Sequence, residues 1–192
     1  MNRRTRGPGA GHAEQRARIA DAVLAIVADQ GLHAVSQTAV ARRAGVSAGR
    51  VQHYFPAKQG LIEAAFDRAN ALARARISAL TGRDAPPREV LTTVLTELIP
   101  HDPATRTHLR VRQAFTALAL ADEAIAARLR EDYAAFHAEL AALLPDAPDP
   151  RAAAVALAGL AEGLAYYVLI GVSAPEDARA RVLAAIAAAH GR

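Results

Sequence analysis

A short polar segment near the amino end carries the side chains best suited to bind another molecule. Arg50, Gln52 and His53 lie within four residues of one another and follow Gly49. Arginine can donate two hydrogen bonds to O6 and N7 of guanine, and glutamine can pair in the same way with adenine. A glycine leaves room for close approach of the backbone to a ligand. The segment is therefore a candidate for reading the edges of base pairs.

Two serines and a glycine define the elements that would hold this segment. Ser36 can cap a short helix whose Val40 and Ala44 face inward. Gly45 can end that helix in the left-handed conformation, and Ser47 can cap a second helix. Two caps eleven residues apart with one glycine between them are typical of a helix-turn-helix, whose second helix enters the DNA major groove.

A helical wheel sorts the residues of the second helix. At about 100° per residue, with Val51 facing inward, the side chains within about 60° of it are those of Ala48, Tyr54 and Phe55. The polar residues point away. We expect Arg50 and Gln52 to read base edges and His53 to contact bases or phosphate. Ser47, Thr38 and Lys58 would bind phosphate, aided by the backbone N–H groups at the two helix amino ends.

The composition indicates an all-α protein. The chain has 192 residues and no cysteine, which excludes disulfide frameworks and cysteine nucleophiles. Alanine occupies 50 positions and aromatic residues only 4%, a usage that suits close-packed helices better than strands. Residues 1–60 carry a net charge of +6 and residues 61–192 a net charge of −2, so the first third has the electrostatics of a polyanion binder.

Helix-breaking prolines and glycines, together with apolar periodicity, divide the chain into about nine helices and three regions. Ile19, Val23, Ile26 and Val27 form the apolar stripe of the first helix, which Gly31 would end. We expect a flexible basic arm over residues 1–12, a three-helix head over 13–58 and a second helical domain over 59–192. Besides the helix-turn-helix pair, helices are expected at 13–30, 57–80, 87–99, 104–121, 122–144, 151–170 and 175–190.

Residues 13–66 resemble the DNA-binding domain of TetR-family transcriptional regulators. The resemblance rests on Thr38, on the run from Ala44 to Gly49, and on the run from Tyr54 through Lys58 to Leu61. It implies an all-helical homodimer in which three amino-terminal helices bind operator DNA. The carboxy-terminal domain would bind a small-molecule effector, here unknown, whose binding shifts the fourth helix and releases the DNA, so that the chain acts as a repressor.

The resemblance also assigns individual contacts. It matches Thr38 and Lys58 to phosphate-binding positions and Tyr54 to an aromatic residue that touches the DNA backbone. The family commonly has Leu-Tyr where this chain has Val51-Gln52. In this departure the chain resembles a subset of the family similar to the choline-responsive BetI repressors. The complete set of expected DNA contacts is Gln37, Thr38, Ser47, Ala48, Gly49, Arg50, Gln52, His53, Tyr54 and Lys58.

The effector site is expected among the large polar-tipped side chains of the second domain. Arg112 and Phe115 share a helix face, as do Tyr133 and Phe136, so each pair could line a cavity. Ordinary core packing is the alternative, and for any single aromatic residue it is the preferred one. The candidates are His108, Arg112, Phe115, Tyr133, Phe136, His137 and Tyr166.

The last two helices, within residues 151–190, are expected to form the dimer interface. They are rich in alanine and leucine, and Gly159 and Gly163 are small residues four apart that would allow close helix approach. The apolar run from Ala152 to Ala161 is interrupted by Glu162 before the length of a membrane span, so no membrane partner is expected and the chain is interpreted as cytoplasmic.

The sequence does not favour an enzyme. It contains no glycine-rich phosphate loop, nucleophile elbow or paired-carboxylate signature, and no cofactor is expected. Pro103 separates His101 and Asp102 from His108, which argues against a metal site on one continuous helix. The alternative function is a small-molecule-binding helical dimer without specific operator binding.

Overall fold

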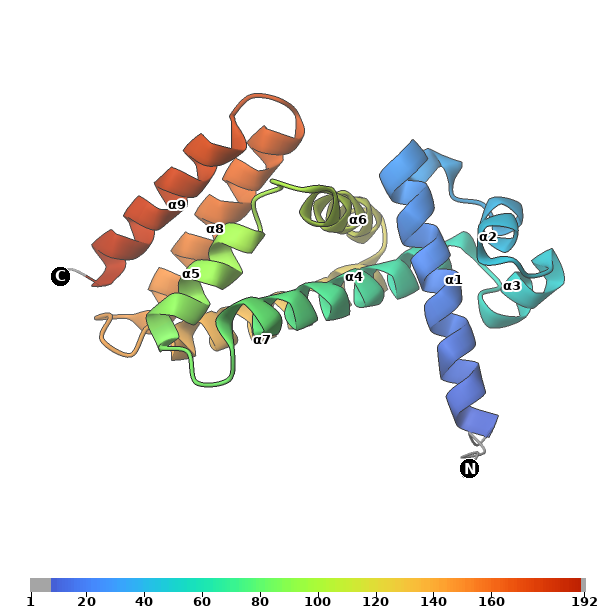
Figure 1. Ribbon diagram of the computed structural model, residues 1–192, viewed down its shortest axis with the longest axis horizontal. Coiled ribbons are helices and arrows are strands. Elements are labelled where there is room, and N and C mark those ends of the chain that lie inside the picture. Colours follow the sequence, from blue (N-terminus) through green and yellow to red (C-terminus); the bar gives the residue numbers. More distant parts are fainter. Residues whose placement is uncertain (1–7, 191–192) are drawn as a thin grey trace. The chain divides into compact units, whose positions relative to one another are not determined.

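The structure is a computed structural model that describes residues 8–190, with residues 8–10 and 190 described by their backbone alone. Within this range the chain is all-α, as predicted, with nine helices and one short 3-10 turn (Figure 1). The elements are α1 (Pro8–Gln30), η1 (Leu32–Ala34), α2 (Gln37–Ala44), α3 (Ala48–Tyr54), α4 (Lys58–Thr81), α5 (Pro87–Glu97), α6 (Pro103–Ala119), α7 (Glu123–Ala142), α8 (Pro150–Leu169) and α9 (Pro175–His190).

The chain forms two compact units whose boundary differs from the predicted division at residue 58. The first unit reaches Ala71 and takes in Arg110–Phe115 from α6, while the second contains the remaining described residues. Phe115 joins the first unit by stacking on Phe66 of α4, with ring centroids 4.1 Å apart and planes 14° apart. Sequence periodicity does not reveal such a contact, because 49 residues separate the two rings.

The apolar stripe of α1 forms the centre of the first unit. The four residues predicted to line it, Ile19, Val23, Ile26 and Val27, are all buried. Gly31 follows α1 with a φ of 83°, which confirms the predicted left-handed stop. Across the unit, Arg68 of α4 binds the Asp21 carboxylate of α1 through two nitrogens at 2.7 and 3.2 Å. This bidentate pair fixes α4 against α1.

The start of α1 corrects the expected flexible arm. The helix begins at Pro8, five residues before the predicted position, so residues 8–12 are helical. Proline is well suited to a first helical position, because its missing N–H would have no intrahelical partner there. His12 also packs its ring against Tyr54 at 4.7 Å, a tertiary contact that favours order. The remainder of the expected arm, residues 1–7, lies outside the described residues.

The second unit is built around α8. Its core contains residues of α5, α8 and α9, among them Leu91, Leu95, Ala161 and Ile186. Aspartates at positions 102, 122 and 149 cap the amino ends of α6, α7 and α8 by accepting hydrogen bonds from backbone N–H groups. The capped amino ends explain why these helices begin close to the predicted residues.

An ionic network links the second half of α4 to the start of α6. Arg76 lies 2.6 Å from Glu97 and 2.7 Å from Asp102, measured between side-chain nitrogen and oxygen atoms. Desolvation raises the pKa of Asp102, but hydrogen bonds from Thr105 and the charge of Arg76 outweigh it and lower that pKa from 3.8 to about 2. The Asp102 carboxylate is thus both a helix cap and one half of an ion pair.

Helix α8 is more apolar than the sequence analysis expected from the interruption of its apolar run by Glu162. Among the described helices, α8 alone is long and apolar enough to cross a membrane by length and composition. A core helix of a soluble protein meets the same criterion, and seven α8 residues between Ala154 and Val168 are buried in the structure. Glu162 accepts a hydrogen bond from the Tyr133 hydroxyl at 2.9 Å, so this carboxylate has a protein partner.

Candidate nucleic-acid interface

The helix-turn-helix forms with both predicted caps in place. Ser36 accepts a hydrogen bond from the N–H of Ala39 at 3.1 Å, and Ser47 accepts one from the N–H of Arg50 at 3.2 Å. Gly45 ends α2 with φ 66° and ψ 39°, the left-handed conformation that the turn requires. Local sequence chemistry therefore accounts for the start of each helix and the turn between them.

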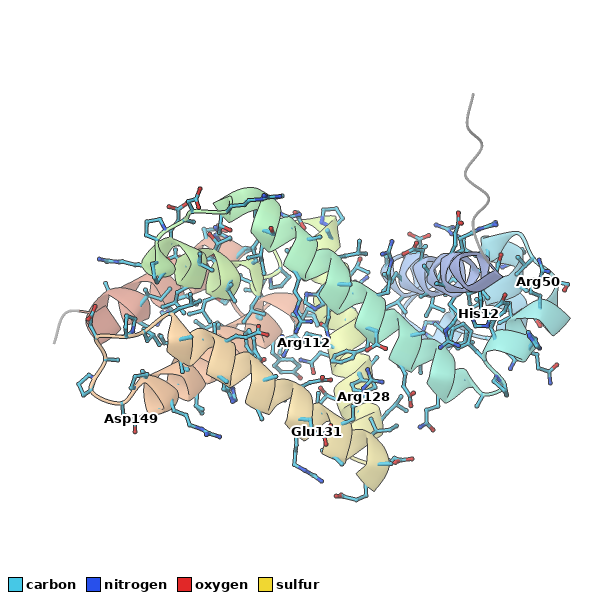
Figure 2. The ribbon with its side chains drawn as sticks, turned by 90° about the horizontal axis from the view of Figure 1, so that it is seen from below. His12, Arg50, Arg112, Arg128, Glu131 and Asp149 are labelled. Carbon is cyan, nitrogen blue, oxygen red and sulfur yellow. The ribbon has the colours of Figure 1, made fainter. Side chains whose placement is uncertain are left out.

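Recognition helix α3 presents the polar face that the wheel predicted. Val51 is fully buried, while Arg50, Gln52 and His53 are exposed. Figure 2 shows Arg50 on this helix and His12 on the neighbouring α1. Ala48 is a correction to the wheel: it is exposed, because as the first residue of α3 it has no preceding helical turn to pack against.

The other predicted DNA contacts fall into two groups. Thr38, Ser47, Gly49 and Lys58 are exposed, and Lys58 is the first residue of α4. Tyr54 is half-buried, with its ring between those of His12 at 4.7 Å and His53 at 5.4 Å. The structure therefore brings together, on one compact unit, the residues that the sequence singled out.

Gln37 has a structural role that the sequence did not indicate. Its side-chain N–H₂ group donates to the carbonyl oxygens of Phe55 at 3.2 Å and Pro56 at 2.9 Å. These carbonyls follow directly after α3, so Gln37 ties the start of α2 to the end of the recognition helix. The donors that would have contacted DNA are already used within the protein.

Two arginines of α1 were missed by the sequence reasoning. Arg16 donates to the carbonyl oxygen of Tyr54 at 3.3 Å, and Arg18 donates to that of Ala44 at 3.1 Å. Each of these carbonyls belongs to the last residue of a helix of the helix-turn-helix. Both lie within the helix predicted over 13–30, but their partners come from α2 and α3, and the apolar periodicity of α1 carries no information about those partners.

The predicted effector residues are divided between the two compact units. Arg112 and Phe115 belong to the first unit, where Phe115 is fully buried against Phe66 and follows the core alternative. In the second unit, Tyr133 donates to Glu162, and its ring lies 5.7 Å from that of His137. Of the remaining candidates, His108 and Phe136 are half-buried and Tyr166 is exposed.

Glu162 contacts Tyr133, one of the predicted effector residues, and is not among the residues that the sequence reasoning proposed. The signal was the single carboxylate within an apolar helix, since a charge placed there needs a partner. No cluster of three or more histidine and carboxylate side chains suited to a metal ion occurs in the described part of the chain.

Two family models match the chain. Residues 19–65 match the model described as bacterial regulatory proteins, tetR family. Residues 87–191, more than half of the chain, match the model described as BetI-type transcriptional repressor, C-terminal. The two matches cover the helix-turn-helix and most of the second unit.

Curated relatives match this chain over only part of their length. The HTH-type transcriptional regulator PksA of Bacillus subtilis is 31% identical over 108 residues, which are 56% of this chain and 53% of PksA. BetI of Pectobacterium carotovorum is 48% identical over 50 residues, 26% of either chain. The chain thus spans about half of PksA and about a quarter of BetI.

Solved structures match over nearly the whole length. A structure from Rhodococcus sp. assigned to the TetR family is 30% identical, has a TM-score of 0.80, and is matched over 93% of this chain and 100% of its own. A transcriptional regulator from Saccharomonospora viridis in complex with choline has a TM-score of 0.77 at 24% identity, covering 90% of this chain and 95% of its own, and shares the fold. Both relatives are described as transcriptional regulators. The chain belongs to the TetR family of transcriptional regulators and carries a BetI-type C-terminal domain.

Proposed function

We propose that this protein is a homodimeric repressor that binds operator DNA through α3 and releases it when a small-molecule effector binds the second unit. The observation that carries the proposal is the exposed polar face of α3, where Arg50, Gln52 and His53 are held outward by the burial of Val51. An arginine and a glutamine on one face of a capped helix match the donor pattern needed to read guanine and adenine.

The proposed contacts divide by chemistry. Arg50 and Gln52 read base edges, His53 contacts bases or phosphate, and the small residues Ala48 and Gly49 allow the helix to sit deep in the groove. The phosphate contacts are those of Thr38, Ser47, Tyr54 and Lys58, with the amino ends of α2 and α3 adding backbone donors. Gln37 contributes to the proposed interface indirectly: its N–H₂ group does not donate to DNA but holds the segment after α3 in place.

An outward apolar face on α8 and α9 supports the proposed dimer. Four large apolar or aromatic residues in or next to α8 are 44% to 52% exposed, namely Val155, Tyr166, Tyr167 and Ile170. Gly159 and Gly163 lie exposed on the same helix, and a Cβ atom at either would meet nothing within 4 Å. Packing within one chain does not require these glycines, whereas close approach of a second copy would.

Aromatic and acidic side chains of the second unit support a cationic effector. The Tyr133 hydroxyl and the Glu162 carboxylate lie 2.9 Å apart, and Phe136 and His137 add rings beside them. Aromatic faces and a carboxylate are the groups that bind quaternary ammonium ions. Choline, which is bound by the structural relative from Saccharomonospora viridis, is therefore the first compound to test.

Helix α4 supports a route from effector to DNA. Arg68 fixes its first half to α1 in the first unit, and Arg76 fixes its second half to Glu97 and Asp102 in the second unit. A ligand that favours one arrangement of the second unit can thereby act on α4 as a lever. Paired recognition helices must lie about 34–36 Å apart, or a multiple of that, to meet successive turns of DNA, so a small displacement suffices for release. As a proposed operator-binding regulator, the protein is expected to act in the cytoplasm.

Selection of duplexes from a random-sequence DNA pool, followed by titration with choline, tests the proposal. The wild-type protein is expected to enrich a two-fold symmetric sequence and to lose it when the effector is added. Choline binding without enrichment of any duplex would instead support the alternative, a small-molecule-binding dimer without specific operator binding.

A further inference from the structure

The recognition helix is too short to fix its own direction. Helix α3 has only seven residues, and Val51 is its single fully buried side chain. Its last backbone hydrogen bond runs from the N–H of Phe55 to the carbonyl of Val51 at 2.8 Å. The Tyr54 carbonyl at its end has no later turn of helix to donate to it, so its partner is either water or a donor from another part of the protein.

Arg16 of α1 provides that partner and a second contact. Its guanidinium group donates to the Tyr54 carbonyl at 3.3 Å and lies over the ring of Phe55, with 4.4 Å between Cζ and the ring centroid. Phe55 is buried in the first unit. One side chain thus joins the end of α3 to a fixed point in the core by a hydrogen bond and a cation–π contact.

His12 extends the same contact to the DNA-facing surface. It lies one helical turn before Arg16 on α1, and its ring packs on Tyr54 at 4.7 Å. The Tyr54 ring in turn meets His53 edge-on at 5.4 Å, with an angle of 81° between the planes. The three rings connect α1 to a side chain of the proposed reading face.

From these contacts we infer that Arg16 is a positioning residue for DNA recognition, supported by His12. It sets the angle at which α3 presents Arg50 and Gln52, and it does so by holding the carboxyl end of the helix rather than by touching DNA. Gln37, which donates to the carbonyls of Phe55 and Pro56, holds the following segment from the other side. The inference rests on the proposed DNA-binding function.

Binding by the full-length dimer to two duplexes over a range of salt concentrations tests this role. One duplex is the sequence that the wild-type protein selects from a random pool, and the other is a scrambled sequence of equal length. Arg16→Ala is expected to lower affinity for the selected duplex on the order of tenfold, because the observed affinity scales with the fraction of molecules in the binding-competent arrangement. Affinity for the scrambled duplex and the salt dependence should match the wild type, since no phosphate contact is lost.

Other results would overturn the inference. Equal losses on both duplexes, with a salt slope reduced by about one per subunit, would identify Arg16 as a phosphate contact. Unchanged affinity for the selected duplex would show that Arg16 does not position α3. A wild-type protein that selects no duplex would contradict the proposed function instead. Arg130→Ala is the matched control, because it removes an exposed arginine that pairs with Glu123 on α7, and binding should be unchanged.

Hydrogen exchange in the DNA-free protein gives a second measurement if Arg16→Ala does not fold. In Arg16→Lys, which keeps the charge but not the planar guanidinium, the amide of Phe55 should exchange several-fold faster than in the wild type. The amide of Val40, bonded to the Ser36 carbonyl at 2.9 Å in α2, is the internal reference. Protection of Phe55 equal to the wild type would contradict the positioning role.

Discussion

Lys58, the single lysine of the chain, is exposed at the first residue of α4. We predict that Lys58→Ala weakens binding to every duplex alike, because an ammonium group on phosphate carries no sequence information. The slope of log affinity against log salt should decrease by roughly 0.9 for each subunit. Filter binding between low and moderate salt measures both effects. Lys58→Arg, which keeps the charge, should retain the wild-type slope, and a loss confined to the selected duplex would contradict the assignment.

Asp102 provides a prediction for stability against pH. Its pKa is about 2 in the folded protein and 3.8 without its partners, so the stabilisation is fully present above pH 3.8 and is lost as the pH falls toward 2. The unfolding free energy of Asp102→Asn should therefore lie about 1 kcal/mol below the wild type at pH 5, with a gap that narrows toward pH 2. Urea unfolding at a series of pH values measures the gap. Asp84→Asn, an exposed change between α4 and α5, is the control and should show no such convergence.

Sequence reasoning succeeded for residues whose environment is set locally. The burial of Val51 and the exposure of Arg50, Gln52 and His53 follow from helix periodicity alone. The hydrogen bonds of the Gln37 side chain were not foreseen, because their partners, the carbonyls of Phe55 and Pro56, come from the far end of the next helix. A wheel drawn for one helix contains no information about such contacts.

The two glycines of the helix-turn-helix are predicted to respond oppositely to alanine. Gly45 has a φ of 66°, so Gly45→Ala should lower the unfolding free energy by about 1–2 kcal/mol even though its Cβ would meet nothing within 4 Å. Gly49 lies inside α3 with equally open space, so Gly49→Ala should raise the unfolding free energy by about 0.5–1 kcal/mol. Thermal or urea unfolding of the two variants measures the difference.

Gly49→Ala also separates stability from recognition. The added methyl group projects from the proposed DNA-facing side of α3, so operator affinity should decrease although the free protein is more stable. An increase in both stability and affinity would show that position 49 does not approach DNA closely.

Element boundaries were predictable where a cap or a glycine marks them. Ser36 and Gly45 correctly marked the two ends of α2, Ser47 marked the start of α3, and Gly31 marked the end of α1. The start of α1 was placed five residues late, because a proline between glycines indicates a loop by composition. The ring contact of His12 with Tyr54 supplies the order that local propensity does not predict.

The proposed dimer gives a prediction for the whole molecule. Gly163→Gln should reduce the mass in solution from two chains to one at micromolar concentration, since a long side chain would separate the paired α8 helices. The fold of each chain should persist, because a Cβ at this position meets nothing within 4 Å. Light scattering after gel filtration measures the mass. Ala134→Gln, on an exposed position of α7, is the matched control and should remain dimeric, and a dimeric Gly163→Gln variant would place the interface elsewhere.

The two compact units depend on contacts between residues that are far apart in the sequence. A boundary at residue 58 follows from the helix-turn-helix pattern, whereas the structure assigns α4 up to Ala71 and Arg110–Phe115 to the first unit. Arg110 donates to the Ala28 carbonyl at 2.8 Å, across 82 residues of sequence. Contacts of this range depend on the packed fold and leave no periodic trace in the chain.

The affinity of the Arg50→Ala variant for every single-base variant of the wild-type-selected duplex tests the central claim most directly. If α3 reads base edges, a base change at the position that Arg50 contacts in each half-site should weaken the binding free energy of the wild type by about 1–3 kcal/mol. Arg50→Ala should lose its preference at that position alone and keep the preferences at the others. A variant with the same preference at every position as the wild type would contradict the claim that the exposed face of α3 reads DNA.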